Sequence, residues 1–167
     1  HILAHDSYLI NLGNADKDAL LGNDNTDYRN VAFGKKTTAS GTEVNFKWFP
    51  ENAVDGITQG SDFKVSLNRV DNAWLTIDLE GVYYINQIKI YFLQSPAKYK
   101  VLVSVDGVNY TEIYDQPNAN AGKKSDDVII LEDAIPVRYV KYQQVEMFST
   151  TISNGTVAKY SGNFTEI

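Results

Sequence analysis

The chain has 167 residues, a formal net charge of −6 and no cysteine. That length is enough for one domain with its own core. The net negative charge argues against a nucleic-acid backbone or an anionic membrane as main partner, because both require clustered Lys and Arg. The absence of cysteine excludes disulfide scaffolds, thiolate metal sites and cysteine nucleophiles. No apolar run approaches the roughly 20 residues of a membrane span.

The first 29 residues differ from the rest of the chain. They contain both histidines and a polar run at residues 22–27, and Gly13 and Asn14 interrupt a short leucine pattern that could otherwise form a helix. We therefore expect residues 1–29 to be a linker or N-terminal extension. Residues 30–167 would be the folded module, excised from a longer protein.

From residue 30 onward, apolar residues alternate with polar ones, which is typical of half-buried strands. Such runs occur at residues 74–79, 88–92, 99–105, 128–130 and 137–141. Asp106-Gly107 predicts a tight hairpin, because glycine accepts a positive φ. Residues 118–127 and 149–163 are expected to be loops. Short strands separated by Gly, Asn and Asp turns predict an all-β sandwich.

Four segments have a distinctive order and spacing: ENAVDG at residues 51–56, WLTIDL at 74–79, VLVSVDGVNYTEI at 101–113 and RYVKY at 138–142. Together they resemble the F5/8 type C (discoidin-like) domain, and in particular its bacterial branch, the family 32 carbohydrate-binding modules. The resemblance covers residues 30–167 and implies an all-β, jelly-roll β-sandwich with a structural calcium site. Eukaryotic members usually join their ends by a disulfide, which this chain cannot form, so a bacterial member is favoured.

The resemblance also implies a set of Ca²⁺ ligands. Calcium takes six to eight oxygen ligands, many of them backbone carbonyls. The implied ligands are the carboxylates of Asp55 and Glu166, the carbonyls of Asn52, Ile57 and Thr165, and the hydroxyl or carbonyl of Ser61. Ser61 departs from the family pattern by one position, because Gly60 stands where a threonine is expected. The alternatives are sodium in the same site, or a plain Asp55-Gly56 turn with Glu166 as a surface charge.

Sugar recognition requires an aromatic face for the apolar side of the ring and polar groups for its hydroxyls. In the resembled family these groups lie on loops at one end of the sandwich, the usual place for binding residues. The ligand-binding candidates are Phe46, Trp48, Gln94, Lys98, Asn120, Phe148, Tyr160 and Asn163. An aromatic among them could instead cap the core, and the polar ones could be solvated. Trp74 matches a family core position, so we expect it to pack inside.

Family members that prefer galactose commonly show a histidine and an arginine in the site. No histidine follows residue 5, and Arg69 falls in a long loop. The galactose arrangement is therefore doubtful from the sequence, which shifts weight toward N-acetylglucosamine-type sugars.

The function implied by the resemblance is that of a non-catalytic carbohydrate-binding module. As a monomeric part of a larger secreted or cell-surface bacterial glycoside hydrolase, it would tether that enzyme to terminal N-acetylglucosamine, galactose or N-acetylgalactosamine-type sugars of host glycans. A Ser-His-Asp triad is not available in residues 30–167, which have no histidine, and no paired glycosidase carboxylates lie in a recognisable motif. We thus expect no enzyme activity, no nucleic-acid partner and no membrane partner.

The alternative is a lipid- or protein-binding discoidin domain used in adhesion. In that case Phe46, Trp48 and Phe49 would be apolar spikes, although the net charge opposes anionic lipid.

Overall fold

Antiparallel strands make up most of the computed structural model, which describes residues 1–9, 28–43 and 47–167, with only the backbone at residues 5–9 and 28. The strands are β1 (Ile2–Leu9), β2 (Tyr28–Asn30), β3 (Lys36–Ala39), β4 (Val65–Ser66), β5 (Trp74–Gln94), β6 (Lys98–Ser104), β7 (Thr111–Gln116), β8 (Ser125–Glu146), β9 (Phe148–Thr151), β10 (Val157–Tyr160) and β11 (Asn163–Glu166). A 3-10 helix, η2 (Pro50–Val54), precedes β4. None of the helices formed by the described residues is long and apolar enough to cross a membrane.

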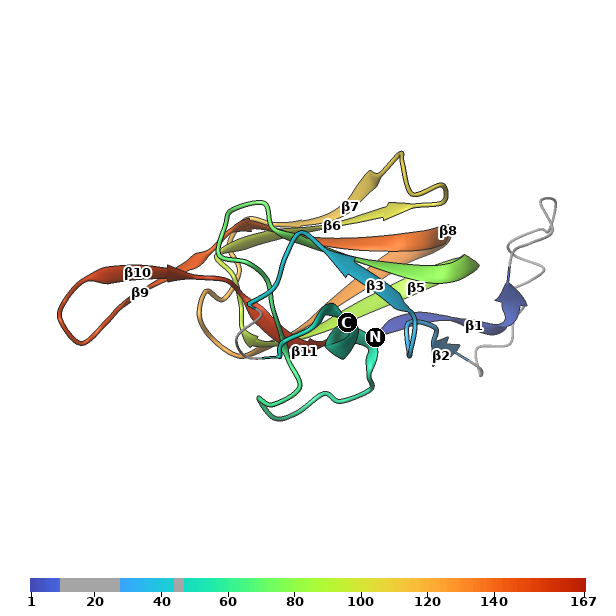
Figure 1. Ribbon diagram of the computed structural model, residues 1–167. Coiled ribbons are helices and arrows are strands. Elements are labelled where there is room, and N and C mark those ends of the chain that lie inside the picture. The colour runs from blue at the N-terminus through green and yellow to red at the C-terminus, as the bar shows by residue number, and fades with distance from the viewer. Residues whose placement is uncertain (10–27, 44–46) are drawn as a thin grey trace.

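The long strands β5 and β8 pair with each other and connect the two sides of the molecule. β5 also pairs with β3, then with β1, and finally with β11, while β8 pairs with β6 (Figure 1). The register between β5 and β8 shifts between Asp78 and Tyr83 and again between Ile85 and Gln87. Such irregularities bend a strand and increase its twist. The predicted strands at residues 74–79 and 88–92 are therefore parts of one bent strand in an antiparallel β-sandwich.

The core lies between the inward faces of these strands. Leu75, Ile77 and Leu79 are fully buried, as the alternation predicts. At one end of the core, the ring of Phe92 lies 5.2 Å from Tyr99 and 6.0 Å from Phe164, measured between ring centroids. Aromatic rings bury a large apolar area and dominate the energetics of a core. This cluster stabilises the end of the sandwich at which β5 pairs with β11.

In β8 the observed inward face differs from the predicted one. Ile129 is buried, whereas Ile130 is 75% exposed. Past Val137 the buried residues are Val140 and Tyr142, and not Tyr139 and Lys141. The register with β5 shifts between Val137 and Tyr139, and such an irregularity changes which residues face the core beyond it. The alternation therefore locates the strand correctly and assigns the wrong residues to the core.

Trp74 is another correction. Its neighbours in the chain, Ala73 and Leu75, are fully buried, while the Trp74 side chain is half-buried on the opposite face of β5, with Thr76 and Asp78. Side chains of a strand alternate between faces, so a core position for Leu75 excludes one for Trp74. Trp74 lines a surface pocket and does not belong to the core.

The N-terminal segment also differs from the prediction. β1 pairs with both β2 and β5, and Ile2 and Ala4 are fully buried. Residues 2–9 and 28–29 thus belong to the sheet and are not a linker. Residues 10–27, the remainder of the predicted extension, lie outside the described residues.

Two hairpins shape the surface. Asp106-Gly107 lies in the connection between β6 and β7, with Gly107 at φ 76°, and this connection spans residues 105–110, longer than the tight hairpin that the sequence predicted. The predicted loop at 149–163 contains a second hairpin, in which β9 pairs with β10 and projects from the sandwich (Figure 1). This hairpin brings Tyr160 to the end of the sandwich at which β4 and β11 pair.

Candidate functional site

A pocket of about 180 Å³ opens at the end of the sandwich where three loops meet. Its walls come from the segment before η2, the residues around β4, the end of β5 and the connection from β10 to β11. The residues that line it are Glu43, Trp48, Lys64, Ser66, Arg69, Gln94, Tyr160, Ser161 and Asn163. We call this the loop-end pocket. Of the eight predicted sugar-binding residues it brings together Trp48, Gln94, Tyr160 and Asn163.

Arg69 also lines the pocket, although the sequence did not predict it as a ligand contact. Its Nε donates a hydrogen bond to the Glu43 carboxylate, and its guanidinium carbon lies 4.6 Å from the centroid of the Tyr160 ring. The Glu43 hydrogen bond raises the pKa of Arg69. Arg69 lies three positions after β4, and β4 pairs with β11. This pairing, which the sequence does not reveal, brings Arg69 to the pocket.

Trp48 also lines the pocket. The Lys64 ammonium lies 4.1 Å from the centroid of its ring. Burial lowers the pKa of Lys64, and the Glu43 carboxylate opposes this effect. The pocket thus presents an indole beside one carboxylate and two cations. Such a set can stack on a sugar ring and hydrogen-bond its hydroxyls.

Amide groups line the deep end of the pocket. Asn163 Nδ2 donates to Gln94 Oε1 at 3.0 Å, while the buried Asn163 Oδ1 accepts no hydrogen bond within the described part of the chain. A buried polar atom without a partner is uncommon in native proteins. A ligand hydroxyl that donates to Asn163 Oδ1 would satisfy it.

The other predicted sugar-binding residues lie elsewhere. Lys98 is exposed and pairs with Glu146 at 2.9 Å, and Asn120 is exposed on a loop that does not line the pocket. Phe148 is only 3% exposed, which corrects its assignment as a ligand contact, because a buried ring cannot stack on a sugar. It packs instead on Tyr160, with 5.9 Å between ring centroids. Phe46 lies outside the described residues.

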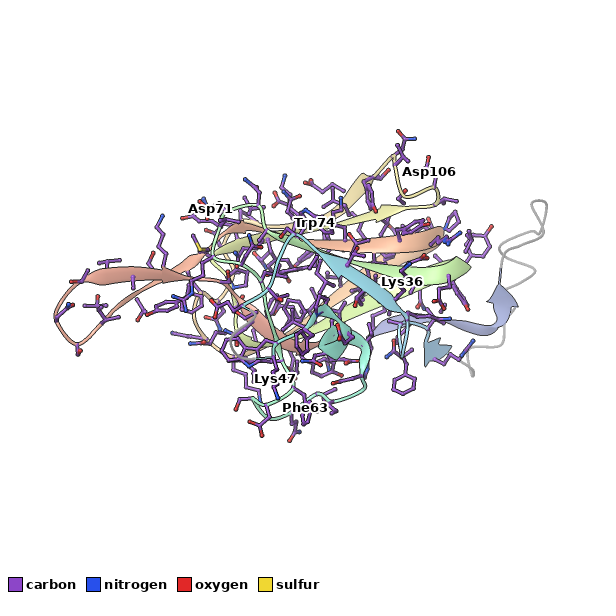
Figure 2. All side chains as sticks on the ribbon, in the orientation of Figure 1. Lys36, Lys47, Phe63, Asp71, Trp74 and Asp106 are labelled. Carbon is purple, nitrogen blue, oxygen red and sulfur yellow. The ribbon has the colours of Figure 1, made fainter. Side chains whose placement is uncertain are left out.

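A second, shallower pocket of about 540 Å³ adjoins the first and shares Trp48 and Lys64 with it. Its other residues include Lys47 and the exposed rings of Phe49 and Phe63. Lys47 and Phe63 lie together on the loops at the lower edge of the sandwich in Figure 2.

The predicted calcium residues converge only in part. Glu166 is fully buried, and its Oε2 accepts a hydrogen bond from Gly56 N at 3.1 Å. Its Oε1 accepts none among the described residues. Burial raises the pKa of Glu166 to about 8, and the neighbouring Asp55 contributes to the shift. A carboxylate that is buried next to another carboxylate requires either a proton or a cation.

The remaining candidates make contacts of their own. Thr165 Oγ1 donates to Thr58 O at 3.0 Å, and Asp55 Oδ1 accepts from Ile57 N at 2.8 Å. Asn52 Nδ2 donates to Lys64 O at 3.1 Å and leaves its own carbonyl as the predicted ligand. The exposed Ser61 lines the shallow pocket. The described residues contain no group of three or more His, Cys, Asp or Glu side chains suited to a metal, so a cation here would depend on carbonyl oxygens.

Comparison with known proteins places this geometry in a family. The F5/8 type C domain family matches residues 36–160. The chain is 31% identical to the polysaccharide lyase 8 family protein HylA of Enterococcus faecalis over 125 residues, which are 70% of the chain. The chain spans only 9% of that protein's length.

Two solved structures share the fold. One is chitosan-binding module 1 of a chitosanase/glucanase from Paenibacillus sp. IK-5, with a TM-score of 0.65 and 22% identity over 83% of this chain and 96% of that module. The other is CpGH89CBM32-4 of Clostridium perfringens in complex with glcNAc-alpha-1,4-galactose, with a TM-score of 0.65 and 17% identity over 84% of this chain and 92% of that one. At these identities the likeness concerns the fold. The family match over residues 36–160 shows that the chain belongs to the F5/8 type C domain family.

Proposed function

We propose that this chain is a non-catalytic carbohydrate-binding module that tethers an attached bacterial carbohydrate-active enzyme to terminal sugars. The observation that carries the proposal is the loop-end pocket, in which Trp48, Arg69 and Glu43 surround a space lined by amides. One aromatic face with a few convergent polar groups is the usual composition of a small-ligand site.

The preferred sugar is an N-acetylglucosamine, galactose or N-acetylgalactosamine-type end. Arg69 lies in the pocket and pairs with Glu43, so an arginine is available for a galactose-type sugar, although the pocket lining includes no histidine. The two structural neighbours support this class, since one is a chitosan-binding module and the other was solved with glcNAc-alpha-1,4-galactose.

The mechanism is an increase in local concentration. A shallow site binds a sugar with a Kd of micromolar to millimolar order, or about 4–8 kcal/mol. Tethering converts the next encounter of the attached enzyme with its polysaccharide into an intramolecular event. The attached enzyme would be a secreted glycoside hydrolase or a lyase, and the relative HylA is a lyase.

A structural Ca²⁺ ion would stabilise the loop after η2. The carboxylates of Asp55 and Glu166 would hold it, with the carbonyls of Asn52, Ile57 and Thr165 and an oxygen of Ser61. The donor set consists of hard oxygen atoms, which suits calcium. Glu166 Oε1, which accepts no hydrogen bond among the described residues and lies 3.9 Å from His1 Nε2, fits such an ion. When bound, the ion supplies the positive charge that compensates the buried Glu166 carboxylate and the neighbouring Asp55 carboxylate. It joins the loop after η2 to the last strand.

A lipid-binding adhesion domain is the second candidate, and one observation favours it. Phe49 and Phe63 are exposed beside Lys47 on one set of loops. Exposed rings next to a lysine could insert into a membrane interface. Co-sedimentation with liposomes of phosphatidylserine and phosphatidylcholine distinguishes this candidate from the first.

The experiment that tests the first proposal is a glycan array probed with the wild-type chain, Arg69→Ala and Lys98→Ala. We expect binding to a defined set of terminal sugars, with a loss of at least about tenfold in Arg69→Ala. Lys98→Ala also removes one exposed cation and should bind as the wild type does. An array without signal, together with liposome binding, would replace the sugar proposal by the lipid one.

A further inference from the structure

A separate pocket lies on the outward face of the sheet and shares no lining residue with the loop-end pocket. It has a volume of about 360 Å³ and is formed by β3, β5, β8 and the loop between β6 and β7. We call it the sheet-face groove. Figure 2 shows two of its residues, Trp74 and Lys36, along β3, away from the loops that hold Lys47 and Phe63.

Paired residues of β3, β5 and β8 form the floor of the groove. Thr76 of β5 lies between Thr38 of β3 and Lys141 of β8, and in the next row Asp78 lies between Lys36 and Tyr139. Side chains on the same face of neighbouring strands lie close enough to interact. The floor is therefore small and polar at Thr76.

Aromatic side chains stand around this floor. Trp74 and Tyr139 are half-buried on the two long strands, and Tyr110 reaches over from the loop between β6 and β7. A well-packed sheet face would close such a space. Three partly exposed rings around a polar floor instead leave a groove that suits the flat face of a sugar.

The groove is positive in a chain of negative net charge. The Lys141 ammonium lies 4.0 Å from the centroid of the Tyr110 ring and 5.3 Å from that of Trp74, so the two rings hold it in place. Asp78 accepts two hydrogen bonds from Arg138, at 2.9 and 3.1 Å, which satisfies its charge. The ion pairs found in the described part of the chain include neither Lys141 nor Lys36.

We infer that the sheet-face groove is a second glycan site, and that it binds a chain containing uronic acids. The rings of Trp74 and Tyr110 take the sugar faces, and Lys141 forms a charge-assisted hydrogen bond with the sugar carboxylate. Such bonds are shorter and stronger than neutral ones. The net negative charge of the chain opposes an anionic polysaccharide, so the local positive charge of the groove favours binding there.

The two sites together define the role of the groove. The loop-end pocket binds the end of a glycan, whereas a groove across strands admits an internal segment. Two weak contacts with one polysaccharide increase its retention without either contact being strong.

The two tryptophans provide a direct test, because Trp48 lines the loop-end pocket and Trp74 lines the groove. Their indole N–H signals in a ¹H–¹⁵N spectrum report the two sites separately. The probes are trisaccharides of galacturonic, glucuronic and mannuronic acid, each with its neutral methyl ester. We expect a uronate to shift the Trp74 signal, and its ester to bind at least about tenfold more weakly.

Variants then establish the contact. Lys141→Gln should weaken uronate binding by at least about tenfold, and Lys124→Gln, the same charge change at an exposed position outside both pockets, should not. Thermal melts check that the variants fold, and Trp74→Ala provides a second groove variant. Uronates that shift only the Trp48 signal or neither signal, equal binding of the esters, or an unaffected Lys141→Gln would overturn the inference. The terminal-sugar proposal is tested separately: it fails if the sugars of the glycan array do not shift the Trp48 signal.

Discussion

At the scale of single residues, Asp106 shows how one side chain can build a turn. Its Oδ1 accepts hydrogen bonds from the backbone N–H groups of Val108 and Asn109, both at 2.8 Å, and from Ser104 Oγ at 2.9 Å. Asp-Gly predicts this hairpin from the sequence because Asp bonds to the backbone that follows it and Gly accepts the positive φ. This site is fully determined by local chemistry.

These hydrogen bonds lead to a prediction about pH. The backbone N–H donors hold the pKa of Asp106 well below its usual value. The ionised carboxylate therefore stabilises the fold above its unfolded pKa of about 3.9, and this contribution is lost as the pH falls through the folded pKa. We expect Asp106→Asn to melt below the wild type at pH 7, with a smaller difference near pH 2. Asp126→Asn removes the same charge from an exposed position, and an equal effect there would contradict the argument.

Phe148 shows the opposite case, a residue whose role is decided by distant contacts. Its ring packs on Tyr160 and closely approaches Gly122, where an added Cβ would lie 3.1 Å from it. We expect Phe148→Ala to reduce the free energy of unfolding by about 3–5 kcal/mol, the range for large-to-small aromatic changes in a core. Urea denaturation measures this change. A loss below about 1 kcal/mol would mean that the ring is a surface group after all.

At the scale of elements, close approach decides how the segment between β10 and β11 packs. Gly162 N donates to the buried Gln144 Oε1 at 2.7 Å. A Cβ at Gly162 would lie 2.7 Å from the backbone nitrogen of Pro96, which cannot move as a flexible side chain could.

We therefore expect Gly162→Ala to destabilise the fold by about 1–3 kcal/mol, as overpacking does. Because Ser161 and Asn163 line the loop-end pocket, the same change should also weaken binding there. Thermal melts and a sugar titration measure both effects. Ser153→Ala, in the exposed part of the β9–β10 hairpin, is the control and should change neither.

The strand pattern shows what periodicity can and cannot predict. Alternation located β6 and both ends of β5, and it correctly buried Leu75, Ile77 and Leu79. It assigned the wrong face in β8, and past Val137 the reason is a register shift that leaves no mark in the local pattern. The family resemblance misplaced Trp74, whereas strict alternation from Leu75 would have put it on the outward face, where it now lines the sheet-face groove.

At the scale of the whole molecule, the two parts of the predicted calcium site are far apart in the sequence and adjacent in the fold. Asp55 follows η2 and Glu166 ends β11, and a hydrogen bond from Gly56 N to Glu166 joins the two segments. The raised pKa of Glu166, about 8, reflects its burial. Without a cation, its contribution favours the fold below pH about 4.5 and is lost as the pH rises toward 8.

We predict that the effect of Glu166→Gln on the melting temperature changes sign when calcium is removed. With calcium at pH 8.5, Glu166→Gln should melt below the wild type, because it loses a ligand. In EDTA at the same pH it should melt at or above the wild type, because no uncompensated buried carboxylate remains. Differential scanning calorimetry in both buffers tests this. Glu132→Gln, an exposed site, should follow the wild type in each. A wild-type melt that does not change with EDTA would count against a calcium site.

The sequence by itself determined the fold class and the family. The alternation of apolar and polar residues, the turn residues and the order of the motifs are local properties that can be read directly from the sequence. It also named Trp48, Tyr160, Gln94 and Asn163, which come together at the loop-end pocket. Only the tertiary structure decided that Arg69 and Glu43 join them, that Phe148 is buried, that β1 belongs to the sheet and that a groove crosses its outward face. These depend on strand pairings and bulges between segments far apart in the chain, and such contacts are set by packing and leave no local pattern.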